Sequence, residues 1–154
     1  MSQTLQKCLV RSIPKATEDM VKALLRLPED KRGWSPAPTS RTALDQAAEI
    51  AILNGGTADI LAARTWTMGD DFSEYFKAKA ELATSWDNVK ALLDTNTARV
   101  IAAVETLSDE DLEIEVQMPW GAQTLAQIAA YPYWNACYHE GQINYIASIL
   151  GCLE

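Results

Sequence analysis

The closing segment of the chain, Thr124–Gly151 (TLAQIAAYPYWNACYHEGQINYIASILG), decides the fold class. Thr124 and Gln127 match a capping box that opens a helix, and Gly151 is a typical stop just after the last helical turn. Steps of three and four residues place one stripe on a single helical face, namely Ile128, Tyr131, Asn135, His139, Gln142, Ile146 and Ile149. The sequence therefore predicts a long helix whose inward face is apolar at its ends and polar in its middle.

Three further segments share the helical spacing of apolar residues. We expect helices over about Ser2–Leu27 with Pro14 as a kink or a restart, from Thr39 or Arg41 to Arg64, and from Thr84 or Ser85 through Leu107. Four long helices pack most naturally as a bundle. We therefore predict one all-α domain over residues 1–154, a four-helix bundle with long connecting loops and short extra helices.

The connections between these helices differ in length and character. The segment Pro28–Ser40 is rich in Pro, Gly and Ser and predicts a loop, with Trp34 tucked against the bundle. Thr65–Ala83 predicts a connection that contains one short helix. Glu113–Gln117 alternates as a strand does, and Met118–Gly121 predicts a turn.

Composition excludes several classes of function. The chain has 154 residues, 48% of them hydrophobic, and a formal net charge of -8 without a run of Lys or Arg. An acidic chain of this kind lacks the positive surface that nucleic acids and anionic membranes require. No stretch approaches the roughly 20 apolar residues of a membrane span, and the first residues do not resemble a signal peptide. We expect a cytoplasmic protein whose thiols, Cys8, Cys137 and Cys152, are reduced.

The polar centre of the closing stripe is the first candidate site. Buried polar groups such as Asn135, His139 and Gln142 must be hydrogen-bonded or bound to a ligand, because each bare group costs about 1–3 kcal/mol. His139 is the only histidine, which excludes a ferritin-like di-metal centre with its two Glu-x-x-His motifs. Cys137 lies two residues from it, on a different side of the helix. Ser/His/Asp and Cys/His catalysis stay open, since those partners need not be near in sequence.

The segment Tyr133–Gly151 resembles the closing helix of the DinB-like (YfiT-like) superfamily, which carries the pattern H-x-x-x-H-x-G-Q. This chain has Asn135 and His139 at the two histidine positions, followed by Glu140, Gly141 and Gln142. The stretch Trp34–Ile50 (WSPAPTSRTALDQAAEI) is similar to the family's Trp-containing loop and second helix, where Glu49 takes the position of a third histidine.

The resemblance implies a mononuclear divalent metal, often zinc or nickel, held by three histidines at the mouth of the bundle. Some members are thiol-dependent transferases or isomerases that use mycothiol or bacillithiol, and relatives often form homodimers. Carried over by position, the metal ligands are Glu49, Asn135 and His139. A carboxylate can ligate zinc, but an amide is a weak ligand for zinc or nickel. The implied metal site is therefore degenerate.

Three hypotheses about function compete. The protein is a metal-dependent hydrolase or thiol transferase, a small-molecule-binding module without metal, or a structural bundle whose polar stripe is a hydrogen-bond network. The inward stripe and the family resemblance together predict that Glu49 meets His139 across the mouth of the bundle, with Asn135 one turn away. That contact needs no metal, and it would serve structure or poise His139 as a general base. Six aromatic residues are expected around this mouth, namely Trp34, Trp66, Trp120, Trp134, Tyr131 and Tyr138.

Overall fold

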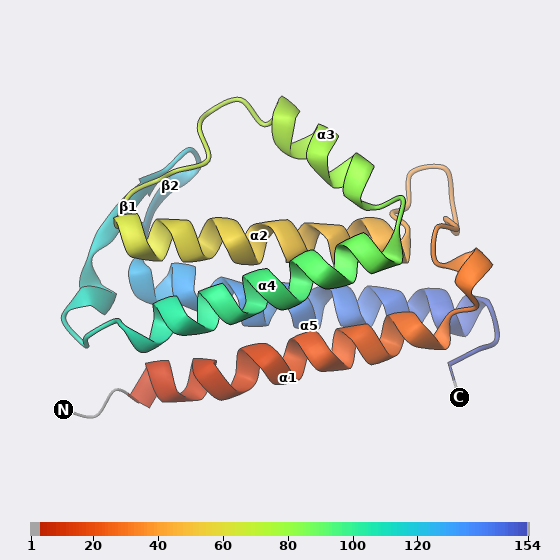
Figure 1. The fold of residues 1–154 in the computed structure, drawn as a ribbon, viewed down its shortest axis with the longest axis horizontal. Coiled ribbons are helices and arrows are strands. Elements are labelled where there is room, and N and C mark those ends of the chain that lie inside the picture. The colour runs from red at the N-terminus through yellow and green to blue at the C-terminus, as the bar shows by residue number, and fades with distance from the viewer. Residues whose placement is uncertain (1–3, 154) are drawn as a thin grey trace.

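Four long helices form the frame of the computed structural model, which describes residues 4–153 (Figure 1). They are α1 (Thr4–Arg26), α2 (Ala43–Ala63), α4 (Trp86–Glu105) and α5 (Leu125–Ile149). α1 lies along α5 and α2 lies along α4, and α2 also contacts α5. The predicted all-α four-helix bundle is confirmed.

The helix ends follow from short polar side chains, with two differences from the sequence prediction. α2 begins at Ala43 because Thr42 is extended and its hydroxyl accepts the amide of Asp45 at 3.1 Å. The spacing of Thr84 and Asp87 approximates a capping box and predicts a cap at Thr84. That prediction is wrong, because α4 is capped by Ser85, which accepts the amide of Asn88 at 3.4 Å. The predicted capping box of α5 is confirmed. Side-chain oxygens satisfy amides that the first helical turn leaves free.

Proline 14 lies inside one continuous helix, so it does not start a second piece of α1. Pro132 lies inside α5 in the same way. The predicted inward stripe of α5 is right at its centre, where Asn135 and His139 are buried, but wrong at two positions. Tyr131 and Ile149 are 36% and 50% exposed. Pro132 and Ala147 are buried near these two positions, because an apolar stripe of 3.6 period drifts around a long helix.

Short elements fill the connections. Two single 3-10 turns, η1 (Glu29–Lys31) and η2 (Asp111–Glu113), flank the bundle ends, and α3 (Ser73–Leu82) is the predicted short helix. The strand-like segment is β1 (Glu115–Met118), which pairs antiparallel with β2 (Gly121–Thr124). The sequence prediction missed β2. Gly121 opens β2 with a φ of 122°, a conformation that favours glycine.

Two apolar clusters stabilise the bundle, one near each end. One centres on Met20, Ile50 and Ile143, and the other on Ile13, Val100, Leu125 and their neighbours. Along α2, α4 and α5 the buried polar residues Asn54, Asn96 and Asn135 fall between the two clusters. Trp34 packs on the first cluster, as predicted.

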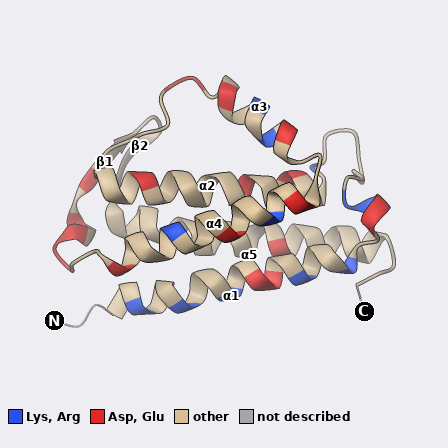
Figure 2. Ribbon diagram, viewed as in Figure 1, with Lys and Arg blue, Asp and Glu red and all other residues tan. Residues whose placement is uncertain are grey.

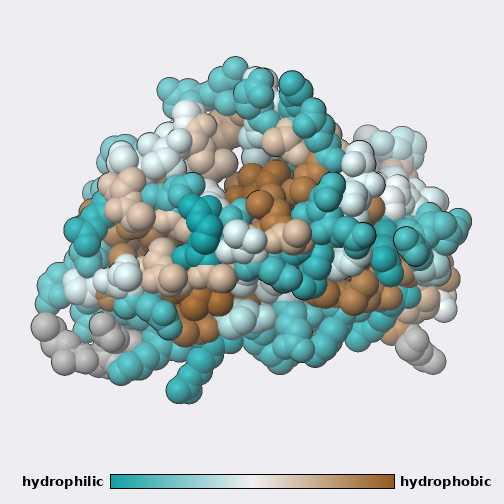
Figure 3. Space-filling model, viewed as in Figure 1, coloured by the Kyte–Doolittle hydropathy of each residue, from teal (hydrophilic) through white to brown (hydrophobic). Residues whose placement is uncertain are grey.

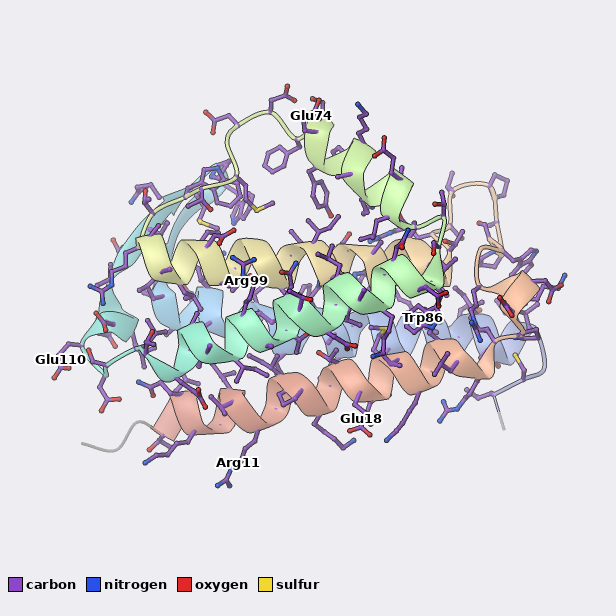
Figure 4. All side chains as sticks on the ribbon, viewed as in Figure 1. Arg11, Glu18, Glu74, Trp86, Arg99 and Glu110 are labelled. Atoms are coloured by element: carbon purple, nitrogen blue, oxygen red, sulfur yellow. The ribbon has the colours of Figure 1, made fainter. Side chains whose placement is uncertain are left out.

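The arch formed by α3 and the loop before it stands apart from this packed frame (Figure 1). Every residue of α3 is partly or fully exposed, and the helix carries both acidic and basic residues (Figure 2). Beneath the arch the space-filling view shows hydrophobic surface in a hollow (Figure 3). Side chains enter the space between α3 and α2 (Figure 4). The candidate site lies at this hollow.

Candidate functional site

His139 is the centre of a buried hydrogen-bond network between α2 and α5. Its Nε2 lies 2.9 Å from Glu49 Oε1, so the predicted contact between these two residues is confirmed. Its Nδ1 lies 3.2 Å from Gln46 Oε1 and 2.8 Å from Gln142 Oε1. The side chain is 1% exposed. Both ring nitrogens are therefore engaged by neighbours, and the imidazole is shielded from solvent.

Glu49 joins this network to the cavity under α3. Its Oε2 lies 2.8 Å from Arg41 Nη2, accepts a hydrogen bond from Tyr75 Oη at 3.4 Å, and lies 3.8 Å from Lys79 Nζ. Burial opposes its ionisation, but the hydrogen bond from His139 and the charge of Arg41 outweigh burial and lower the pKa of Glu49 to about 2. Glu49 is thus a carboxylate at neutral pH, and His139 Nε2 donates to it.

A second carboxylate, that of Asp45, completes a four-charge cluster. It pairs with Arg41 Nε one turn before Glu49, and Lys79 Nζ lies 3.1 Å from its Oδ1. Lys79 is only 12% exposed and comes from α3, whereas the two carboxylates come from α2. The pairs from Lys79 and Tyr75 therefore attach the arch to the bundle.

Asn135 lies one helical turn before His139 and is 1% exposed. Its Nδ2 makes no hydrogen bond with any residue that the structure describes. An amide nitrogen has no lone pair to offer a metal, and only the amide oxygen could ligate one. The predicted burial of Asn135 one turn from His139 is confirmed. Its amide donor, which was expected to be hydrogen-bonded or bound to a ligand, has no partner within residues 4–153.

The three residues at the family's metal positions do not fit a tight zinc or nickel site as they are arranged. Such a site needs free lone pairs, yet both nitrogens of His139 are taken and Glu49 is bonded to His139 and Arg41. The guanidinium of Arg41 and the ammonium of Lys79, 2.8 and 3.8 Å from the carboxylate, would also repel a dication. In the described part of the chain, no group of three or more His, Cys, Asp or Glu side chains is placed to hold a metal ion.

A cavity of about 520 Å³ lies between α2, α3, the hairpin and α5, with Glu49 in its wall. Aromatic rings line it from the loop after α2, from α3, from the hairpin and from α5, chiefly Trp66, Phe72, Phe76, Trp120, Tyr131 and Trp134. Trp66 meets Trp120 edge to face, with ring centroids 5.3 Å apart. Among the described residues that line the cavity, Glu49 is the only charged one.

The sequence analysis predicted some of the aromatic residues that line this cavity. Of the six aromatic residues expected near the site, four line the cavity, Trp34 packs elsewhere, and Tyr138 stacks on Trp134 at 5.2 Å. The rings of α3 and the partners Arg41, Gln46 and Lys79 were missed. The signal for the rings is the run Phe72–Phe76 (FSEYF), which places three aromatic residues within five positions of the connection.

Two tyrosines line the cavity, and the hydroxyl of one of them, Tyr75, donates to Glu49. Burial raises the pKa of Tyr131 to about 12, with a further rise from the charge of Glu49. Burial and the same carboxylate also raise the pKa of Tyr75. Both phenols therefore keep their protons at neutral pH. The site offers apolar rings, neutral donors and a carboxylate with its partners in place, which suits binding more directly than proton transfer by His139.

Comparisons with known proteins agree with this architecture. A sequence model of the DinB superfamily matches residues 13–143. YfiT from Bacillus subtilis, described as a probable metal-dependent hydrolase with an unusual four-helix bundle topology, superposes with a TM-score of 0.79 at 14% identity, over 95% of this chain and 87% of its own. No match was found among curated proteins.

Two other solved structures share the fold. A DinB-like protein of Bacillus subtilis superposes with a TM-score of 0.70 at 16% identity, over 95% of this chain and 94% of its own. A conserved protein from Enterococcus faecalis superposes with a TM-score of 0.72 at 14% identity, over 94% of this chain and 96% of its own. At such identities the likeness establishes the shared fold.

Proposed function

Because this chain belongs to the DinB superfamily and retains that fold, we propose that it binds a small organic molecule in the cavity under α3, independently of a tightly held metal. The observation that carries the proposal is that the two central polar residues of the site already have protein partners, whereas the adjoining cavity is open. His139 and Glu49 are already bonded to protein groups, whereas a cavity of about 520 Å³ beside them remains open. Cavities of roughly 300–1,000 Å³ with apolar walls and few polar groups are typical of small-molecule sites.

Exposed rings around the cavity support binding. Trp120, Phe76 and Trp134 are 60%, 59% and 55% exposed although each contributes to the wall. Burying apolar surface is worth about 25 cal/mol per Å², so a ligand that covers these rings gains affinity from them. In this proposal His139 is a positioning residue, which fixes the Glu49 carboxylate at one end of the cavity.

The test uses protein treated with a chelator and dialysed, so that any divalent metal is removed. A library of small aromatic compounds is screened by thermal shift, and binding is then measured by calorimetry. We expect ligands that raise the melting temperature without added metal, since binding to the native state alone stabilises it. Leu53→Trp, which fills the cavity from α2, should abolish those shifts. Leu25→Trp, at an exposed position on α1, is the matched control. Shifts that need zinc or nickel would contradict the proposal.

A second candidate is metal-dependent hydrolysis, or the thiol transfer that the family resemblance implies. It is favoured by one observation, that YfiT is described as a probable metal-dependent hydrolase. In this case Glu49, Asn135 and His139 would be the residues that hold zinc or nickel. Hydrolysis of a p-nitrophenyl ester that appears on addition of zinc and disappears in His139→Gln would replace the first proposal with this one.

Oligomeric state and location remain predictions. In the described residues, no helix is both long and apolar enough to cross a membrane. The homodimer implied by the resemblance has a candidate surface on α5, where Tyr145, Tyr138 and Ile149 are 70%, 50% and 50% exposed. Light scattering across a range of concentrations should give the mass of two chains. A single-chain mass throughout that range would remove the dimer.

A further inference from the structure

The charges at the end of the cavity restrict what it can bind. Arg41 and Lys79 supply two positive charges, and Asp45 and Glu49 supply two negative ones. Every member is in contact with a group of opposite sign at 3.8 Å or less. This cluster is paired before any ligand enters, so an ionic ligand would have to break an existing pair to obtain a partner.

Glu49, the only charged side chain among the described residues of the wall, has little hydrogen-bonding capacity left for a ligand. Glu49 Oε1 accepts from His139, and Oε2 accepts from Arg41 and Tyr75. A cation approaching Glu49 would also meet the guanidinium at 2.8 Å and the ammonium at 3.8 Å from the same carboxylate. An anion would meet the carboxylate first, since the two cations lie behind it and outside the cavity wall.

Although Lys79 does not line the cavity, its ammonium contacts two of the lining rings near Glu49. Its Nζ lies 5.9 Å from the ring centre of Tyr75 and 5.8 Å from that of Phe76, within the range of a cation–π contact. These two rings, which could otherwise attract an alkylammonium ligand, thus already have a cation partner within the chain. The rest of the wall consists of neutral side chains in the described residues, most of them rings, methionines and aliphatic groups.

We infer that the ligand is an uncharged, flat aromatic molecule that lies against the exposed rings of the cavity. This inference rests on the proposed function and names the chemical class for the same site. A neutral ring system gains from stacking and from apolar burial. A charged analogue of the same shape would lose hydration without finding an unpaired charge of opposite sign. Tyr131 Oη and the amide of Gln123, both in or beside the wall, suit a hydroxyl or carbonyl substituent.

The experiment compares three probes that share the pyrene ring system and carry a small neutral, anionic or cationic substituent, namely 1-pyrenemethanol, 1-pyrenecarboxylate and 1-pyrenemethylammonium. Fluorescence titration of metal-stripped protein should show the neutral probe bound at least about tenfold more tightly than either ion. Two charge variants sharpen the test. Glu49→Gln leaves the cations in excess and should strengthen binding of the carboxylate probe, whereas Lys79→Met should strengthen binding of the ammonium probe.

Two kinds of failure are distinguishable in this design. The cavity is filled from opposite walls by Leu53→Trp on α2 and by Met118→Trp on the hairpin, so one misfolded variant does not stop the test. If both folded variants bind the neutral probe as wild type does, the cavity is not the site and the proposed function fails with the inference. If both variants lose binding of the neutral probe, but an ionic probe binds wild type as tightly as the neutral one, the inferred ligand class is wrong. The cavity is then still the binding site, as the proposed function states.

Discussion

Two buried polar clusters in this bundle use similar side chains and have different consequences. Between α2 and α4, Asn54 Nδ2 donates to Thr97 Oγ1 at 3.1 Å and Asn96 Nδ2 donates to the Ala51 carbonyl at 2.8 Å. Between α2 and α5, His139 is held by Glu49, Gln46 and Gln142. Both clusters satisfy buried groups, which would be costly if left without partners.

The difference lies in what surrounds each cluster. At the α2–α4 cluster the helices approach so closely that a Cβ added to Gly55 would lie 2.5 Å from Asn96 Nδ2. Space for a ligand is filled there by protein. The α2–α5 cluster contains an ionised carboxylate and faces a cavity of about 520 Å³. A buried polar cluster thus indicates a binding site when it adjoins open apolar surface, and specifies packing when it does not.

The largest effect should come from restoring metal ligands at the α2–α5 cluster. Wild-type protein should bind zinc and nickel weakly, and Glu49→His with Asn135→His should raise the affinity at least about 100-fold, equivalent to roughly 2.7 kcal/mol. Each single change should help less, because two ligands leave an ion largely hydrated. Titration of wild type, both singles and the double variant by calorimetry measures this.

Two results would oppose that expectation. Stoichiometric tight binding by wild type, with no gain in the double variant, would mean that Asn135 is not a lost ligand position. A folded double variant that binds no metal would mean that positions 49, 135 and 139 do not converge on one ion.

Next in size is a packing effect at the α2–α4 cluster. Gly55→Ala should lower the free energy of unfolding by about 2 kcal/mol, because the new methyl group displaces Asn96 from its buried hydrogen bond. Gly141→Ala is the matched control on α5, where the added Cβ meets no atom within 4 Å among the described residues. That change should raise stability by about 0.5–1 kcal/mol. Urea denaturation measures the free energy of unfolding of both variants. If both substitutions raised it, helix propensity alone would account for the two changes, and the predicted clash at Gly55 would be wrong.

Acid should weaken the α2–α5 cluster selectively. The pKa of Glu49 is lowered from an ordinary 4.5 to about 2 in the folded protein. The ionised carboxylate therefore contributes fully to the free energy of unfolding above pH 4.5, and this contribution is lost as the pH falls toward 2. The carboxylate lies partly open to the cavity, so we expect a loss on the order of 1.5 kcal/mol after screening. Glu49→Gln should flatten this part of the stability profile. Parallel profiles for wild type and variant between pH 2 and 4.5 would contradict the assigned pKa.

The smallest expected effect concerns the attachment of the arch. Lys79→Met removes contacts from α3 to Asp45 and Glu49, but each carboxylate keeps Arg41 as a partner. Global stability should fall by less than about 1 kcal/mol, while hydrogen exchange of α3 amides becomes faster. Exchange in α4 is the internal reference. If α3 and α4 respond alike, the lysine stabilises the whole bundle rather than the arch.

The sequence was sufficient for the frame of the fold and for the contact at the centre of the site. Helical periodicity and capping residues are local signals, and they predicted the four helices. The meeting of Glu49 with His139 was predicted from the inward stripe of the closing helix together with the resemblance to the DinB-like family. The ions that surround Glu49 depend on tertiary placement. Arg41 lies in the loop before α2, and Lys79 is in the short helix α3, 30 residues after Glu49. Spacing along the chain therefore does not indicate that both reach one carboxylate.

The cavity was predictable only in its composition. Aromatic residues near loops and helix ends indicated rings around the site, but the sequence does not specify that α3 stands away from α2 and leaves a hollow. β2 was missed because Gly121–Thr124 has few β-branched residues, and its pairing with β1 depends on the turn conformation.

His139 allows the most direct test of the account, because it is the only histidine and its side-chain nitrogen signals need no assignment by mutation. The measurement is a long-range ¹⁵N–¹H NMR spectrum of the imidazole, recorded on metal-stripped protein before and after one equivalent of zinc. We predict that both ring nitrogens keep their chemical shifts, since Glu49, Gln46 and Gln142 already occupy them. A change of one ring nitrogen to the shift of a zinc-bound imidazole, reversed by chelator, would contradict a metal-independent site.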